Sequence, residues 1–136
     1  MPGGTVAFPV APDVAFDYLV DPANRAEWQS SLRRVDHVAG DVGVGQHWVD
    51  VTKPGLRPLM RTTVFERPAR WAESGSWHGV TADLELRFTA TPGGCDVAFG
   101  FRVRMLGPVG RAFTAASVPA VRSDLRRAAE VLSRRS

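Results

Sequence analysis

Hydrophobic and polar residues alternate along the middle of the chain, and this pattern predicts β-strands. Leu84, Leu86 and Phe88 alternate with charged residues, and a second alternating segment follows from Val97 to Met105. Because successive side chains of a strand point to opposite faces, each segment has one apolar and one polar face. Turn residues rich in Gly and Pro separate such segments. We expect six successive antiparallel strands, the first starting at Leu32 and the others over residues 46–52, 59–66, 70–77, 80–90 and 95–105.

The segment before these strands has a different pattern. Residues 5–10 form a short apolar run that ends between two prolines, which predicts a terminal strand. The next apolar residues have helical spacing, and we expect a short helix that Asp13 caps and that ends before Pro22. A second short helix is expected from Pro22 to about Trp28.

The end of the chain returns to helical spacing from Gly107 onward. Its apolar residues fall on one stripe, which consists of Phe113, Ala116, Ala120, Val121, Leu125, Ala128 and Leu132. Pro119 lies inside this helix and is expected to bend or divide it. The element order predicts an α+β fold, in which a curved seven-stranded antiparallel sheet wraps around the long C-terminal helix. The two short helices after the first strand would close one end.

Composition is that of a globular protein with a modest net charge. The 136 residues are 44% hydrophobic and 23% charged, and 17 basic against 14 acidic residues leave a net charge of +3. A chain of this length buries enough surface for one core, so we expect one domain over residues 1–136. The uncharged residues 1–12 lack the basic start and apolar run of a signal peptide. We therefore expect a cytoplasmic protein with no stable membrane insertion.

Several chemistries lack the residues that they require. Cys95 is the only cysteine and Lys53 the only lysine, which argues against a disulfide, a Cys-rich metal site, a Schiff base and a phosphate-binding loop. His37, His47 and His78 do not have the short spacing of metal ligands. We expect neither a metal nor a cofactor.

Several segments together resemble one known superfamily over nearly the whole chain. They are residues 11–22 running on to Trp28, the Gly43-Val44-Gly45 turn, residues 64–68 and the Pro92-Gly93-Gly94 hairpin. In this order they resemble the START-like or helix-grip superfamily, which includes Bet v 1 and the polyketide cyclase/dehydrase and lipid-transport (SRPBCC) proteins. The resemblance implies a helix-grip fold with a cavity for a hydrophobic ligand. Some such proteins act on polyketides, while others carry lipids, hormones or quinones.

Aromatic residues are the first candidates for the wall of such a cavity. They are Trp48, Trp71, Trp77, Phe88, Phe99, Phe101 and Phe113, all of which can point to the inside of the sheet or to the helix. Each of them could instead be an ordinary core residue. As a group they favour a pocket that stacks against flat apolar ligands.

Charged residues on the same strand faces are the second set of candidates. Asp50 shares its face with Trp48, and Glu73 shares its face with Trp71 and Trp77. Buried carboxylates need a cation.

Arg61, on the strand between those of Asp50 and Glu73, is the candidate for that cation. The pattern of its strand leaves its direction open, because Arg61 and Phe65 form one face while Met60 and Val64 form the other. An inward Arg61 would pair with a carboxylate or hold an acidic group of the ligand, with Phe65 beside it. Salt bridges within the fold, or an outer solvated face, are the alternative.

These observations favour a protein that binds a small hydrophobic ligand, aromatic and polyketide-like or an acyl lipid, in an internal cavity. The alternative is a polyketide cyclase, aromatase or dehydratase that acts in the same cavity. A third class, an interaction module for protein or RNA, would use Arg87, Arg102 and Arg104 on the polar face of the sheet. Because acidic residues alternate with these arginines, we expect no nucleic-acid partner. The sequence leaves the oligomeric state open.

Overall fold

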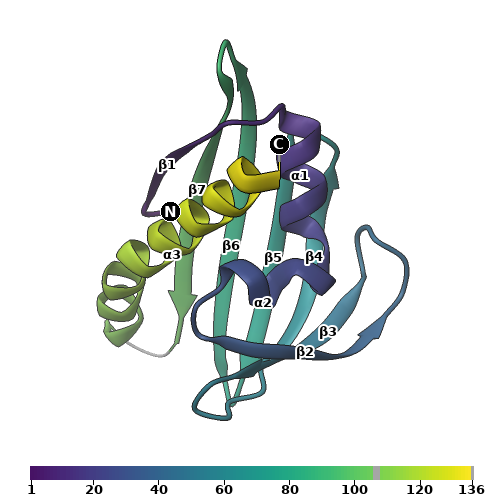
Figure 1. Cartoon of the computed structure of the whole chain (residues 1–136). Helices are drawn as coiled ribbons and strands as arrows, with labels where there is room; N and C mark the ends of the chain where they lie inside the picture. The colour runs from purple at the N-terminus through teal and green to yellow at the C-terminus, as the bar shows by residue number, and fades with distance from the viewer. Residues whose placement is uncertain (106–107, 136) are drawn as a thin grey trace.

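A seven-stranded antiparallel sheet forms the body of the molecule. A computed structural model describes residues 1–105 and 108–135 (Figure 1). The sheet has the order β1-β7-β6-β5-β4-β3-β2, and each neighbouring pair is antiparallel. Its strands are β1 (Gly3–Phe8), β2 (Leu32–Ala39), β3 (His47–Thr52), β4 (Leu59–Glu66), β5 (Arg70–Trp77), β6 (Val80–Thr91) and β7 (Gly94–Arg104).

The helices lie on one face of this sheet. After β1 come α1 (Pro12–Val20), the 3-10 helix η1 (Pro22–Asn24) and α2 (Arg25–Trp28), and the chain ends in α3 (Val109–Arg135). The sheet curves around α3, with β2 and β3 crossing below α2 (Figure 1). This arrangement confirms the fold predicted from the sequence. No helix among residues 1–105 and 108–135 is long and apolar enough to span a membrane.

Details of two helices differ from the prediction. Ala11, not Asp13, is the N-cap of α1, and the Asp13 carboxylate accepts from the adjacent backbone N–H of Val14. The helix starts two residues earlier than a cap at Asp13 predicts, because Pro12 fits its first turn, where a missing N–H costs nothing. The predicted division of the C-terminal helix is wrong, since α3 runs through Pro119 without interruption. Pro119 is exposed, so water can satisfy the carbonyl that its missing N–H leaves free.

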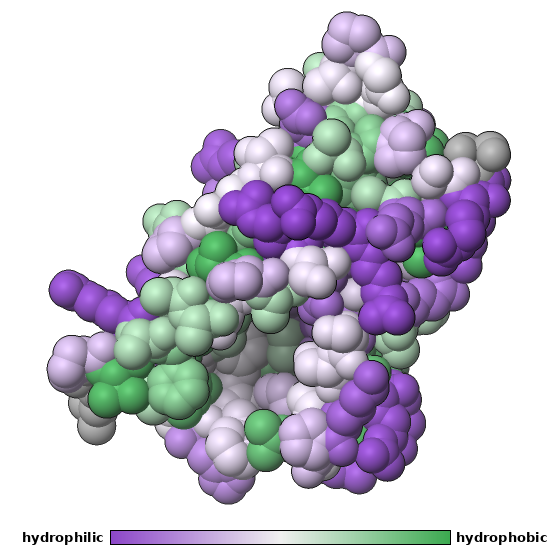
Figure 2. Space-filling model, turned by 60° about the vertical axis from the view of Figure 1, so that its left-hand side comes forward, coloured by the Kyte–Doolittle hydropathy of each residue, from purple (hydrophilic) through white to green (hydrophobic). Residues whose placement is uncertain are grey.

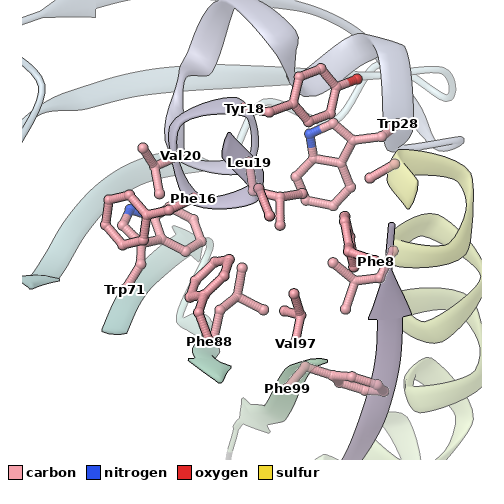
Figure 3. Packing of buried hydrophobic residues seen from close by; sticks show 14 of the residues in the cluster. Phe8, Phe16, Tyr18, Leu19, Val20, Trp28, Trp71, Phe88, Val97 and Phe99 are labelled. Atoms are coloured by element: carbon pink, nitrogen blue, oxygen red, sulfur yellow. The ribbon is translucent and has the colours of Figure 1, made fainter. Parts of the chain in front are cut away.

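The apolar core occupies the end of the sheet that α1 covers. The Phe16 ring meets the rings of Phe65 and Phe88 edge to face, at 5.2 Å between centroids in both pairs. Figure 3 shows side chains from α1, β1 and the sheet converging there, Trp71 and Val97 among them. Because this end is filled by side chains, any interior space lies toward the opposite end of the sheet.

A buried hydroxyl attaches the first turns of α3 to β7. Thr114 Oγ1 accepts from the Val103 N–H at 2.8 Å and donates to the Gly110 carbonyl at 2.8 Å. We expect Thr114→Val to lower the free energy of unfolding by about 1–3 kcal/mol, because the Val103 N–H would lose its partner. Urea denaturation measures this difference. Ser117→Ala is the matched control, since the Ser117 hydroxyl bonds only to the Phe113 carbonyl of its own helix; equal losses in both variants would contradict this role of Thr114.

Candidate functional site

A cavity of about 380 Å³ that opens to solvent lies between the concave face of the sheet, α2 and α3; we call it the internal cavity. Apolar side chains form most of its wall, including Trp28, Met60, Trp77, Val80, Ala82, Leu84, Phe101, Ala120 and Val121. In the space-filling view the molecule is hollowed on this side, with hydrophobic residues along one border and hydrophilic ones along the other (Figure 2).

A buried ion cluster forms the polar part of the wall. Arg25, on α2, is 2% exposed, and its Nε and Nη2 bond to the Asp50 carboxylate at 3.1 and 2.7 Å. Its Nη1 lies 2.9 Å from Glu73 Oε2. The Trp48 indole N–H donates to Asp50 Oδ1 at 2.9 Å, and the guanidinium lies 5.0 Å from the centre of the Trp48 ring. We call Arg25, Asp50 and Glu73 the ion triad; it joins α2 to β3 and β5.

Local helix geometry directs Arg25 into the interior. The Asp21 carboxylate caps η1 by accepting from the Ala23 N–H at 2.9 Å, and α2 follows directly. Arg25 and Trp28 are three residues apart, so they share one face of this helical turn. Both are buried against the sheet.

Electrostatics differ among the charged groups of the cavity. Burial would lower the pKa of the Arg25 guanidinium, but the nearby Glu73 and Asp50 carboxylates outweigh burial and raise it. Burial raises the pKa of Glu73, and the charge of Arg25 offsets only part of that effect. Asp124, on α3, also lines the cavity. Burial raises its pKa, and two hydrogen bonds from Ser30, which lower the pKa, offset only part of that effect. Both carboxyls are therefore easier to protonate than exposed ones.

The structure divides the aromatic candidates among three locations. Trp77 and Phe101 line the cavity. Five others belong to the core or pack against it: Trp48, Phe65, Trp71, Phe88 and Phe99. Phe113 is exposed.

The predicted inward position of Phe113 is wrong, because the buried face of α3 has a different phase. Phe113 is 54% exposed. Gly110 and Thr114 face the sheet, and Leu125, Ala128 and Leu132 continue this face, with intervals of four, eleven, three and four residues between the five positions. Phe113 lies off this face, so its ring points away from the cavity.

The proposed pairing of Arg61 with Asp50 or Glu73 is also wrong. Arg61 is exposed and lies opposite His47 and Ser74, on the outer face of the sheet. A bulge between Thr62 and Val64 explains the error. Before the bulge even-numbered residues face inward, and after it Phe65 does, so Arg61 and Phe65 point to opposite faces.

A second hollow, of about 560 Å³, lies around Arg61. It is lined by exposed or polar side chains such as His37, His47, Leu59 and Ser74, together with the edges of Trp48 and Met60. It is larger than the internal cavity, but it is lined by strands β2 to β5 alone and half of its side chains are exposed, whereas the internal cavity lies between the sheet and two helices. We therefore take the internal cavity as the candidate site.

Comparison with known protein families shows to which family the chain belongs. The family model described as "Polyketide cyclase / dehydrase and lipid transport" matches residues 4–136. The chain belongs to this family. No curated protein matches the sequence.

Solved structures similar to this member of the polyketide cyclase/dehydrase and lipid-transport family show the same fold. Protein MLL2253 from Mesorhizobium loti is 14% identical, with a TM-score of 0.78 over 97% of this chain and 96% of that one. A Rhodobacter sphaeroides protein is 18% identical, with a TM-score of 0.73 over 100% and 97%. Ara h 8.0201 is 14% identical, with a TM-score of 0.70 over 95% of both chains. At these identities the likeness supports the helix-grip fold alone.

Sequence reasoning found both carboxylates of the ion triad but missed its cation. The strand parity of Asp50 and Glu73 placed them on the inner face, where the structure has them. Arg25 lies on the short helix α2, where strand parity makes no prediction about the direction of a side chain. The spacing of Arg25 and Trp28 was the available signal, since an inward Trp28 brings Arg25 to the same side.

Proposed function

We propose that this protein binds a small hydrophobic ligand with a flat ring system in its internal cavity. The observation that carries this proposal is the 380 Å³ cavity with aromatic walls on Trp28, Trp77 and Phe101. Cavities of this size enclose ligands of drug-like size, and burial of apolar surface supplies the main driving force. Membership of a family whose description includes lipid transport supports the same proposal.

The ion triad gives this cavity a fixed wall. Because Arg25 joins α2 to β3 and β5 through two carboxylates, it positions Trp28 beside the cavity. A wall of fixed side chains loses less conformational freedom when a ligand binds than a mobile wall does. We therefore expect ligands to meet a preformed site.

Tryptophan fluorescence provides the first test. We expect 2-naphthalenemethanol to quench the fluorescence and to bind with a dissociation constant of about 1–100 μM, because Trp28 and Trp77 line the cavity and the ligand buries about ten carbon atoms. Isothermal calorimetry on the same samples gives the stoichiometry. One site per chain supports the proposal, while absence of binding by this alcohol and by a panel of fatty acids and ring compounds would refute it.

The second candidate function is a cyclase or dehydratase acting in the same cavity. The observation that favours it is Glu73, a buried carboxyl with a raised pKa that lines the cavity. Such a group can take a proton from carbon between two carbonyls and return it to an oxygen. Chromatographic detection of a cyclised or dehydrated product from a poly-β-keto thioester separates this function from binding alone.

A further inference from the structure

The charged groups around the cavity are predominantly acidic. Among the cavity-lining residues that the structure describes, Asp50, Glu73 and Asp124 are carboxyls and Arg25 is the cation. With every group ionised, this part of the wall has a charge of −2. Arg127, outside the lining, compensates part of the Asp124 charge, but the ion triad by itself has one more carboxylate than cations. A buried carboxylate without a full partner is costly, so this excess is informative about the ligand.

Arg25 has no N–H left for an acidic ligand. Its Nε and Nη2 bond to Asp50, and its Nη1 is directed to Glu73. With the Gln29 amide oriented so that its oxygen faces the guanidinium, this oxygen accepts from Nη2 at 3.2 Å and from Nη1 at 3.3 Å. Of the five N–H bonds of the guanidinium, Asp50 and Gln29 accept four, and the remaining one is on Nη1, which forms the ion pair with Glu73. A carboxylate that entered the cavity would find Arg25 already fully paired.

Glu73, in contrast, is incompletely paired. The residue is 5% exposed, and its Oε2 lies 2.9 Å from Arg25 Nη1 but outside the alignment of a hydrogen bond. Its carboxyl therefore keeps acceptor capacity while facing the cavity. Asp124 contributes a second carboxyl on the α3 side, with Ser30 bonding to one of its two oxygens.

We propose that the ligand of this cavity is a hydrophobic amine, with its protonated nitrogen against Glu73 and its ring system against Trp77 and Phe101. This inference rests on the proposed function and specifies its ligand class. A cation beside Glu73 would complete the pairing that Arg25 supplies to Asp50, and the aromatic wall would cover the apolar body. Burial raises the pKa of Glu73, and an ammonium group beside it would restore the ionised carboxylate.

Three ligands with the same ring and different charge test this proposal. They are 2-naphthylmethylamine, 2-naphthalenemethanol and 2-naphthoic acid, each titrated by calorimetry at pH 7.5. We expect the amine to bind about 10- to 100-fold more tightly than the acid, because the ammonium gains a charged hydrogen bond to Glu73 that the carboxylate cannot form. The alcohol should lie between them.

The variant Glu73→Gln tests the position of the amine. It should weaken binding of the amine about 10- to 100-fold and leave binding of the alcohol within about twofold, because only the charge is removed. Glu66→Gln is the matched control: Glu66 is an exposed carboxyl on β4, and its loss should change neither affinity.

The outcomes separate this inference from the proposed function. Equal or tighter binding of the acid by the unmodified protein overturns the inference, even if Glu73→Gln does not fold. An equal loss for amine and alcohol in Glu73→Gln also overturns it, because the carboxyl would then act on the fold alone. Failure of all three ligands to bind would instead refute the proposed function, and this inference with it.

Discussion

Replacing Arg25 by methionine is expected to lower the free energy of unfolding by about 3–5 kcal/mol, the cost of leaving buried charges without their partner. Asp50 and Glu73 would both remain in the interior, and Arg25 is the cation that the structure places against them. Methionine is unbranched and matches the aliphatic part of the arginine side chain, so the loss reports mainly on removal of the guanidinium. Urea denaturation followed by circular dichroism measures the change.

Arg61→Met is the matched control for this variant. Arg61 is exposed on the outer face of the sheet, and its replacement should change the free energy of unfolding by less than about 0.5 kcal/mol. A loss of unfolding free energy below about 1 kcal/mol in Arg25→Met would contradict the assignment of Arg25 as the central cation. Equal losses in Arg25→Met and Arg61→Met would contradict it as well.

Filling the cavity is expected to weaken ligand binding without unfolding the protein. Ala82 lies on β6, in the row of inward residues that Leu84 and Leu86 continue, and it lines the cavity. In Ala82→Phe the added ring would enter space that a ligand occupies. We expect a loss of binding free energy of about 1–3 kcal/mol for 2-naphthalenemethanol, similar to the cost of overfilling a packed site. Calorimetry measures the affinity and thermal unfolding monitors the fold.

Ala90→Phe provides the comparison on the same strand. Ala90 is exposed, near the end of β6 that lies beyond Phe88 and away from the cavity. Its replacement should leave the affinity within about twofold, since the new ring would not reach the ligand. If both variants bound the alcohol as the unmodified protein does, the ligand would not occupy the internal cavity.

The sheet could be predicted from sequence because its signal is local and repeated. In β6 the apolar residues Leu84, Leu86 and Phe88 alternate with charged ones, so the sequence indicates which face of the strand is buried. The same alternation placed Asp50 and Glu73 correctly, since each lies two residues from a large aromatic side chain. Parity is reliable wherever a strand pairs regularly with its neighbours.

The errors have equally physical causes. The bulge after Thr62 shifts the parity of β4, and no glycine or proline near it marks the shift. On α3 the predicted apolar stripe begins with a large residue, Phe113, whereas the smaller Gly110 and Thr114 face the sheet there. Arg25 faces inward because of the direction of one short helical turn, which depends on how α2 packs and not on local pattern.

Nuclear Overhauser effects between 2-naphthalenemethanol and methyl groups of the protein test the central claim most directly, because they report which residues lie within about 5 Å of the ligand, little more than the 4.0–4.5 Å of an apolar contact. The alcohol is neutral, so the result does not depend on the charge preference of the site. We predict effects from the ring protons to the methyl groups of Leu84, Val80 and Val121, which line the internal cavity. Effects confined to Val49 and Leu59 of the outer hollow would contradict the account.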